Sequence, residues 1–285
     1  MTGNSSPRPL LPPYDPDVEP VGSITGGLLD RMRRHNGTAT VSEPVGSGTD
    51  APTFVSTIER AASGLASRGV CPGDVVAVLA PVSPARLTAV YTVMAVGGVV
   101  LPLERNATVD TETQIDALTK TDTRLLLVTS PLATVALQLA ERSRVRQVIA
   151  FGQAPETTPF EELLASGAER APHRSHQGSF DNGVLGYQTA GDGAGVVTTL
   201  HSHTDLLHRF RRFDAELDLG PGDVVAVDPG MSEPARAALA ALALWRDVSV
   251  VTIAPETEPE IRRLLEASGA TVRGSPSPAR VVTRE

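Results

Sequence analysis

The heptapeptide PGDVVAV occurs twice in the chain, at 72–78 and at 221–227. A Pro-Ala-Arg step follows a few residues after each copy, at 84–86 and at 234–236. A self-similar segment at this separation indicates that one supersecondary unit is built twice. Chance recurrence in a chain rich in valine and glycine is the alternative, and the matching helical segments around both copies argue against it.

Each copy has the pattern of a turn that leads into a buried strand. Pro-Gly-Asp suits a tight turn, because proline fixes one dihedral angle and glycine permits the next. The apolar run VVAVLA that follows at 75–80 is rich in β-branched residues, which is typical of a strand covered on both faces. Phe54, Ile58 and Leu65 share one face of a helix before the first copy, and Pro84 suits the first turn of the helix after it.

The same plan recurs in the second half of the chain. A helix with Leu206 and Phe210 on one face precedes the second copy, and Pro234 opens the helix after it. Strands and helices that alternate with short connections predict an open α/β fold with right-handed crossovers. We therefore predict two similar, mostly parallel sheets with helices on both faces. The predicted first subdomain is 21–180, and the second, incomplete one is 181–285.

Composition narrows the class of protein. The chain is 41% hydrophobic but only 4% aromatic, so the core must be aliphatic. A net charge of −8 disfavours binding to nucleic acid. Cys71 is the only cysteine, which excludes an intrachain disulfide framework and a cysteine-rich metal site.

The sequence predicts neither a membrane span nor a signal peptide. The longest uncharged run, 87–103, is too short for a bilayer and is interrupted by glycine and proline. The N-terminal segment 1–20 has no apolar core of the signal-peptide kind, and its proline and serine content predicts a disordered leader. We expect a cytoplasmic protein.

A glycine-rich segment, TAGDGAG at 189–195, separates two predicted strands at 184–188 and 196–200. Such a turn can direct several backbone N–H groups at a phosphate. A Walker loop would require Gly-Lys-Ser or Gly-Lys-Thr, and a dinucleotide fingerprint would lead directly into a helix; neither pattern is present. The alternative is a hairpin turn that binds no ligand.

The order of these segments resembles a known family. The stretch 53–103, the Gly/Thr loop, LHSHTDLL and LGPGDVVAV are similar to the N-terminal half of the adenylate-forming acyl-CoA synthetases and peptide-synthetase adenylation domains. In that family two similar α/β subdomains form most of the large N-terminal domain, which would account for the repeat. The resemblance begins near Val21 and implies ATP or AMP as the ligand. The binding residues that it implies are Thr189, Gly191, Asp192, Gly193, Gly195 and His203.

The phosphate loop departs from the family pattern. Members end this loop in Pro-Lys-Gly, whereas Val196 and Val197 stand there in this chain. Asp192 adds a negative charge where the family has a threonine, and Lys120 is the only lysine in the chain. The resemblance also implies that the adenine- and ribose-binding segments and a small C-terminal domain would lie beyond Glu285. We therefore predict no catalytic residue.

A metal site at three histidines is an alternative use of the same region. His201, His203 and His208 lie close together in the sequence, but no carboxylate or cysteine stands at ligand spacing to complete the set. The resemblance already assigns His203 to the start of the helix after the loop. We therefore predict no metal ligands.

These observations lead to one functional prediction and two alternatives. Adenylation requires cations around the phosphates of ATP, and this sequence has lost them. We predict a truncated, ligase-like protein that is inactive alone and serves as a binding subunit. Its partner would be a full-length ligase, a carrier protein or a second copy. The alternatives are an active or split acyl-adenylating ligase completed by a partner chain, and a simple binder of nucleotide or acyl-CoA.

Overall fold

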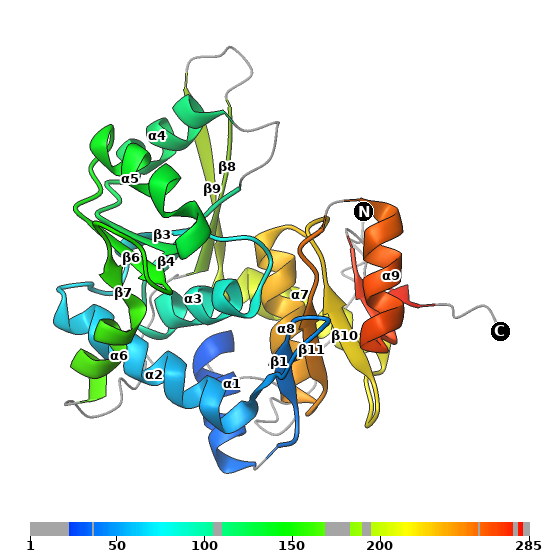
Figure 1. The fold of residues 1–285 in the computed structure, drawn as a ribbon. Coiled ribbons are helices and arrows are strands. Elements are labelled where there is room, and N and C mark those ends of the chain that lie inside the picture. Colours follow the sequence, from blue (N-terminus) through cyan, green and yellow to red (C-terminus); the bar gives the residue numbers. More distant parts are fainter. Residues whose placement is uncertain are drawn as a thin grey trace, which may run out of the picture.

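A computed structural model of the protein describes residues 23–35, 37–104, 110–168, 183–189, 195–255, 257–275 and 279–281. Two sheets lie side by side in it, with helices between them and on their outer faces (Figure 1). The predicted leader, 1–20, lies outside the described residues. Of the helices that the structure describes, none is long and apolar enough to cross a membrane.

The first sheet has seven strands in the order β7-β6-β5-β3-β4-β8-β9. Neighbouring strands are parallel except for the β8–β9 hairpin, which is antiparallel. The strand at its centre is the first copy of the repeat. The strands are β3 (Val75–Leu79), β4 (Val99–Leu103), β5 (Leu125–Thr129), β6 (Gln147–Phe151), β7 (Thr158–Pro159), β8 (Gly183–Thr189) and β9 (Val196–Ser202).

The second sheet has six strands in the order β13-β12-β10-β11-β1-β2. Its β12, β10, β11 and β1 are parallel, and β13 and β2 pair antiparallel at the two edges. The second copy of the repeat supplies β10. The strands are β1 (Thr40–Ser42), β2 (Thr49–Asp50), β10 (Val224–Val227), β11 (Ser249–Thr252), β12 (Val272–Gly274) and β13 (Ala279–Arg280).

The helices begin where the sequence places capping residues. Ser83 and Asp50 cap α3 and α2, and Ser202 forms a reciprocal capping box with Asp205 at the start of α7. A short 3-10 turn at Ser130–Leu132 precedes α5. The helices are α1 (Ile24–Arg34), α2 (Ala51–Ser67), α3 (Pro84–Ala95), α4 (Thr111–Lys120), α5 (Ala133–Glu141), α6 (Phe160–Ala168), α7 (His203–Leu217), α8 (Glu233–Trp245) and α9 (Glu258–Ser268).

One helical layer is shared by the two sheets. The main apolar cluster contains Val76 and Val78 of the first sheet, Val225 and Val250 of the second, and side chains of the helices between them. Every residue of α8 is buried, which fits its alanine-rich sequence with no polar face. The outer face of the first sheet packs on α4 and α5, and that of the second packs on α9. The predicted α/β fold with two mostly parallel sheets and helices on both faces is confirmed.

The two sheets do not follow the order of the chain. Strand β1 comes from residues near 40, yet it pairs with β11 of the second sheet, where Val41 faces Val250. Strands β8 and β9 come after residue 180, yet β8 pairs with β4 of the first sheet. A division of the chain into subdomains at residue 180 stays a prediction, but sheet membership crosses that boundary in both directions.

Candidate functional site

The carboxyl ends of the two sheets meet at the beginnings of α3 and α8. Open α/β sheets bind their ligands outside the carboxyl ends of the strands, so this edge is where a site is expected. Helix α3 follows β3 and helix α8 follows β10, so these helices carry the two Pro-Ala-Arg steps of the repeat. Arg86 and Arg236 stand in their first turns, and each residue is only 1% exposed.

Both arginines bind Glu233. The Nε atom of Arg86 donates to Oε2 of Glu233 at 2.7 Å, and Nη1 of Arg236 donates to the same oxygen. Arg86 also forms an ion pair of 2.9 Å with Glu104, which directly follows β4. Main-chain carbonyl groups accept further hydrogen bonds, for example that of Met231, which accepts from Nη2 of Arg236 at 2.8 Å. Nε of Arg236 is buried and has no hydrogen-bond partner among the described residues. The two guanidinium groups are therefore held by protein groups on several sides.

The charges of this cluster stabilise one another. Burial by itself raises the pKa of Glu233, but the nearby charges of Arg236 and Arg86 outweigh it and hold the pKa below its ordinary value. Burial likewise lowers the pKa of Arg86, and Glu233 and Glu104 more than reverse the effect. Both shifts favour the charged forms of Glu233 and Arg86, so the positive charge of Arg86 is matched inside the protein.

A second ion-pair network lies at the same edge of the second sheet. Asp228 directly follows β10, is 1% exposed, and accepts a hydrogen bond of 2.8 Å from Nε of Arg273 on β12. Arg273 also binds both carboxylate oxygens of Glu258, at 2.6 and 2.9 Å. Hydrogen bonding to Glu258 is the main cause that raises the pKa of Arg273. This arginine, too, is paired with carboxylates of its own chain.

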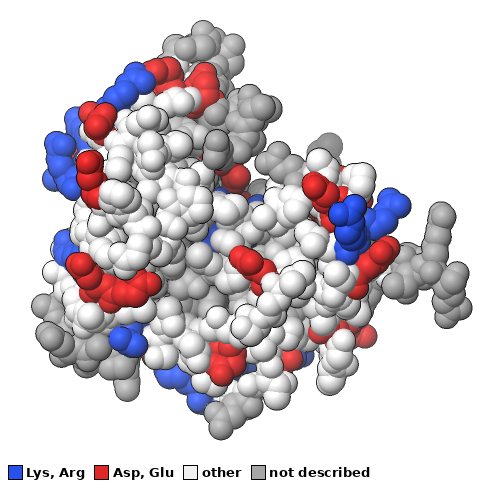
Figure 2. Space-filling view, viewed as in Figure 1, with Lys and Arg blue, Asp and Glu red and all other residues white. Residues whose placement is uncertain are grey.

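Tyr187 of β8 brings the first-sheet hairpin to the same cluster. Burial is the main cause that raises the pKa of Tyr187 to about 12, and Glu104 and Arg86 shift it by smaller amounts. Figure 2 shows a hollow between the parts of the molecule that contain the two sheets, and acidic and basic residues are visible inside it. The edge is therefore polar and accessible, but it carries both signs of charge.

The glycine-rich loop is the connection of the β8–β9 hairpin. Thr189 pairs with Val196, so the connection runs from 190 to 195 and leaves β8 at the carboxyl edge of the first sheet. Gly191, Asp192 and Gly193 lie outside the described residues, as does the side chain of Thr189. Gly195 is described and has a φ of +113°, a conformation that favours glycine.

Helix α4 supports the base of this loop. The Nζ atom of Lys120 donates a hydrogen bond to the carbonyl oxygen of Val196. A Cβ atom added at Gly195 would lie 2.9 Å from a carboxylate oxygen of Asp116, so that side chain also adjoins the loop. Sequence reasoning missed both contacts, although the i, i+4 spacing of Asp116 and Lys120 puts them on one face of α4.

His203 does not join the loop. It is the first residue of α7 and is 7% exposed, whereas the loop lies at the other end of β9. Seven strand residues separate the two ends by roughly 20 Å. Within the described ranges, no group of three or more His, Cys, Asp or Glu side chains could hold a metal ion.

Comparison with known proteins identifies the fold. Residues 53–181 match the family model described as AMP-binding enzyme. A long-chain-fatty-acid-CoA ligase from Archaeoglobus fulgidus superposes with a TM-score of 0.71 at 17% identity, over 88% of this chain and 51% of that one. A benzoate CoA ligase from Burkholderia xenovorans LB400 gives 0.71 at 19% identity, over 88% and 49%. The fold is that of the N-terminal part of acyl-CoA ligases.

The similarity to acyl-CoA ligases is one of sequence in part of the chain and one of fold alone in the rest. The matched segment 53–181 begins in α2 and ends just before β8, so the glycine-rich loop and the second copy of the repeat are related to these ligases by fold alone. The inhibitor-bound N-terminal domain of FACL13 from Mycobacterium tuberculosis is also similar, with a TM-score of 0.68 at 16% identity, over 89% of this chain and 63% of that one. No curated protein matches the chain in sequence. The chain spans about half the length of the two ligases named above.

Proposed function

We propose that this ligase-like chain does not catalyse adenylation and serves as a binding subunit that docks on another protein chain. The observation that carries the proposal is the pairing of the described arginines at the carboxyl edges. Arg86 and Arg236 share Glu233, and Arg273 is held by carboxylates on both sides. These cations stabilise the fold and are not directed at a ligand.

The chemistry of adenylation explains why this pairing matters. A carboxylate oxygen attacks the α-phosphate of ATP and pyrophosphate leaves, so two anions must approach each other. Enzymes lower that barrier with cations and backbone donors that are in place before the reaction. Releasing Arg86 from Glu233 would break a buried ion pair, which costs up to about 3–5 kcal/mol. ATP would have to supply that energy before these arginines could act on its phosphates.

The free edge of β9 supports docking on another chain. Strand β9 ends the first sheet, so its outer backbone groups have no neighbouring strand within the described sheet. Val197 and Leu200 on this strand are 46% and 42% exposed, unusual for large apolar residues in this protein. An edge of this kind binds an extended strand by adding it to the sheet. We propose that the strand added at this edge is β9 of a second copy of the chain. Antiparallel pairing of the two β9 strands would form a closed dimer with twofold symmetry.

Light scattering over a range of protein concentrations tests this docking. We expect the wild-type chain to form a dimer and the double variant Val197→Lys, Leu200→Lys to be a monomer, because charged lysines on an edge oppose strand addition. Val45→Lys is the matched control, since Val45 is 77% exposed on the β1–β2 connection of the other sheet. The control should remain a dimer. A monomeric wild-type chain, or a dimer that the double variant leaves intact, contradicts the proposal.

A second candidate function is nucleotide binding without turnover. Lys120 favours it, because its ammonium group binds the carbonyl oxygen of Val196 at the base of the loop. Calorimetric titration with ATP and with AMP tests this candidate. Binding heat that weakens in Lys120→Gln would support it, and the absence of heat with either nucleotide would remove it.

A further inference from the structure

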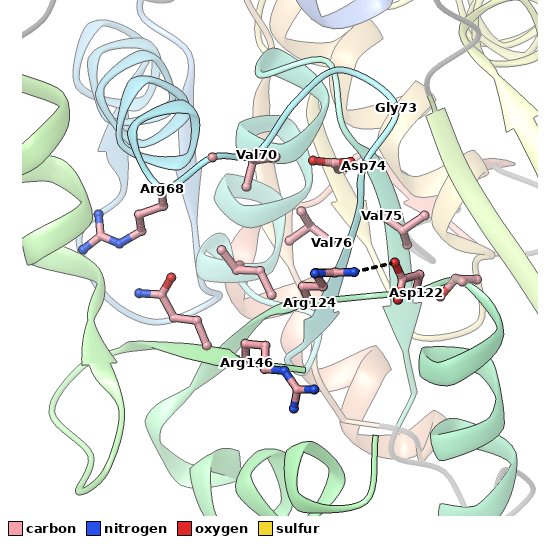
Figure 3. Close-up of a pocket in the computed structure, with 13 residues that line it drawn as sticks. Arg68, Val70, Gly73, Asp74, Val75, Val76, Asp122, Arg124 and Arg146 are labelled. Atoms are coloured by element: carbon pink, nitrogen blue, oxygen red, sulfur yellow. Dashed lines mark hydrogen bonds and ion pairs between the residues drawn. The ribbon is translucent and has the colours of Figure 1, made fainter. Parts of the chain in front are cut away.

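A second hollow lies at the opposite edge of the first sheet, outside the amino ends of β3, β5 and β6 (Figure 3). Its volume is about 590 Å³, which is in the range of pockets that hold small molecules. The strands between the two edges are five residues long, so this hollow and the glycine-rich loop are roughly 15 Å apart or more. The charged residues that line it are Arg68, Asp74, Asp122, Arg124 and Arg146.

The two carboxylates of the hollow are already bound by protein groups. One oxygen of Asp122 accepts from Arg124 at 3.1 Å and the other accepts from Arg144 at 2.9 Å. These hydrogen bonds hold the pKa of Asp122 below its ordinary value, and the bond from Arg144 has the larger effect. Asp74 accepts from the backbone N–H of Cys71 at 2.8 Å and so closes the Pro-Gly-Asp turn. Both acidic groups therefore have structural roles.

Two of the arginines have no acidic partner among the described residues. Arg68 donates to the hydroxyl oxygen of Ser166 at 2.8 Å, a neutral group, and no described carboxylate forms an ion pair with it. For Arg146, within the described part of the chain, no carboxylate lies within ion-pair distance. Arg124 also lines the hollow, so three guanidinium groups and two carboxylates surround it, in a chain whose net charge is −8. The hollow is locally positive on an acidic protein.

The arrangement of the arginines indicates the size of the ligand. Arg68 ends α2, Arg124 precedes β5 and Arg146 precedes β6, and Figure 3 shows their guanidinium groups well separated around the hollow. A molecule with more than one anionic group could meet arginines on different sides of the hollow. Guanidinium groups bind phosphate and carboxylate oxygens in the same forked geometry. We propose that this hollow binds a small molecule that carries at least two anionic oxygen groups, either phosphates or carboxylates.

Calorimetric titration of the full chain at low ionic strength tests the proposal, with inorganic pyrophosphate in one series and citrate in the other. We expect one-to-one binding of at least one probe. Pyrophosphate alone identifies a phosphate ligand, and citrate alone identifies a carboxylate ligand. The variants Arg68→Gln and Arg146→Gln should each weaken that binding by about tenfold, the usual effect of losing one charge-assisted hydrogen bond.

The matched control is Arg142→Gln. Arg142 is an exposed arginine that pairs with Glu112 and does not line the hollow. Its replacement removes the same charge from the same part of the protein. Binding in this variant should change by less than about twofold, because charges in the solvent are screened. Failure of both probes to bind the wild-type chain, or an equal weakening in Arg142→Gln and Arg146→Gln, would overturn the proposal. Neither outcome depends on β9, so the docking proposal is judged separately.

Discussion

Arg86 and Arg236 occupy equivalent positions in the two copies of the repeat, and both bind the same carboxylate oxygen of Glu233. The donor–acceptor distances are 2.7 and 2.5 Å. The repeat therefore does more than supply two strands and two helices. It brings one arginine from each unit to the point where α3 and α8 begin, and a single buried carboxylate joins the two sheets there.

Glu233→Gln should be strongly destabilising. The substitution removes the charge that compensates two buried arginines, and losing one member of a buried ion pair costs about 3–5 kcal/mol. The free energy of unfolding from denaturant titration measures the effect. Glu112→Gln is the control, because its ion pair with Arg142 is largely exposed and should contribute little to stability. A loss below about 1 kcal/mol in Glu233→Gln would contradict the role assigned to the cluster.

The difference between the wild-type chain and Glu233→Gln should shrink in acid. The folded-state pKa of Glu233 is lowered from 4.5, so its stabilisation is fully present above that value and is lost as the pH falls through the lower, folded-state pKa. Below it, a protonated glutamate and a glutamine are nearly equivalent. Denaturant titrations at pH 7, 5, 4 and 3 measure the difference, and a constant difference over this range would rule out the proposed ionisation.

Tyr91→Phe should cost about 1 kcal/mol of unfolding free energy. The hydroxyl group of Tyr91 on α3 donates to the carbonyl oxygen of Ala237 on α8 at 2.7 Å, in a fully buried position. The phenylalanine ring can keep the edge-to-face contact with Phe54, whose ring centroid is 6.0 Å away, so the change isolates the hydrogen bond. A variant as stable as the wild type would show that this bond does not help to join the two helices.

Gly64→Ala should destabilise the packing of α2 on α6 by about 1–3 kcal/mol. An added Cβ would lie 2.2 Å from the carbonyl oxygen of Leu163, which is backbone and cannot rotate away. Gly220→Ala is the control, because no atom lies within 4 Å of the added Cβ. Equal melting temperatures for the two variants would contradict the close approach of these helices.

Much of the fold was predictable, because each local signal agreed with the others. Pro84 and Pro234 lie in the first turns of α3 and α8 as expected, Ser202 caps α7, and Gly269 ends α9 in the left-handed conformation. The hydrophobic run after each Pro-Gly-Asp turn is buried on both faces when it forms an inner strand of a parallel sheet covered by helices. The alternation of strands and helices then restricted the topology to two mostly parallel sheets.

The contacts at the candidate site were not predictable in the same way. Arg86 and Glu233 are 147 residues apart, and Lys120 meets Val196 across 76 residues, so no spacing in the sequence marks either pair. A charged residue in the first turn of a helix is usually exposed, and nothing local to Arg86 shows that it is buried. The same holds for β1, whose short segment gives no sign that it joins the second sheet.

The central claim is that this chain does not catalyse adenylation. Release of pyrophosphate from ATP in the presence of a carboxylic acid tests it most directly. The purified full chain is incubated with ATP, Mg²⁺ and a panel of aromatic and aliphatic carboxylic acids, with an active acyl-CoA ligase as the positive control. Because its arginines at the carboxyl edges are paired with carboxylates of the same chain, we predict no release above the rate without protein. Release that requires both the chain and a carboxylic acid would contradict the account.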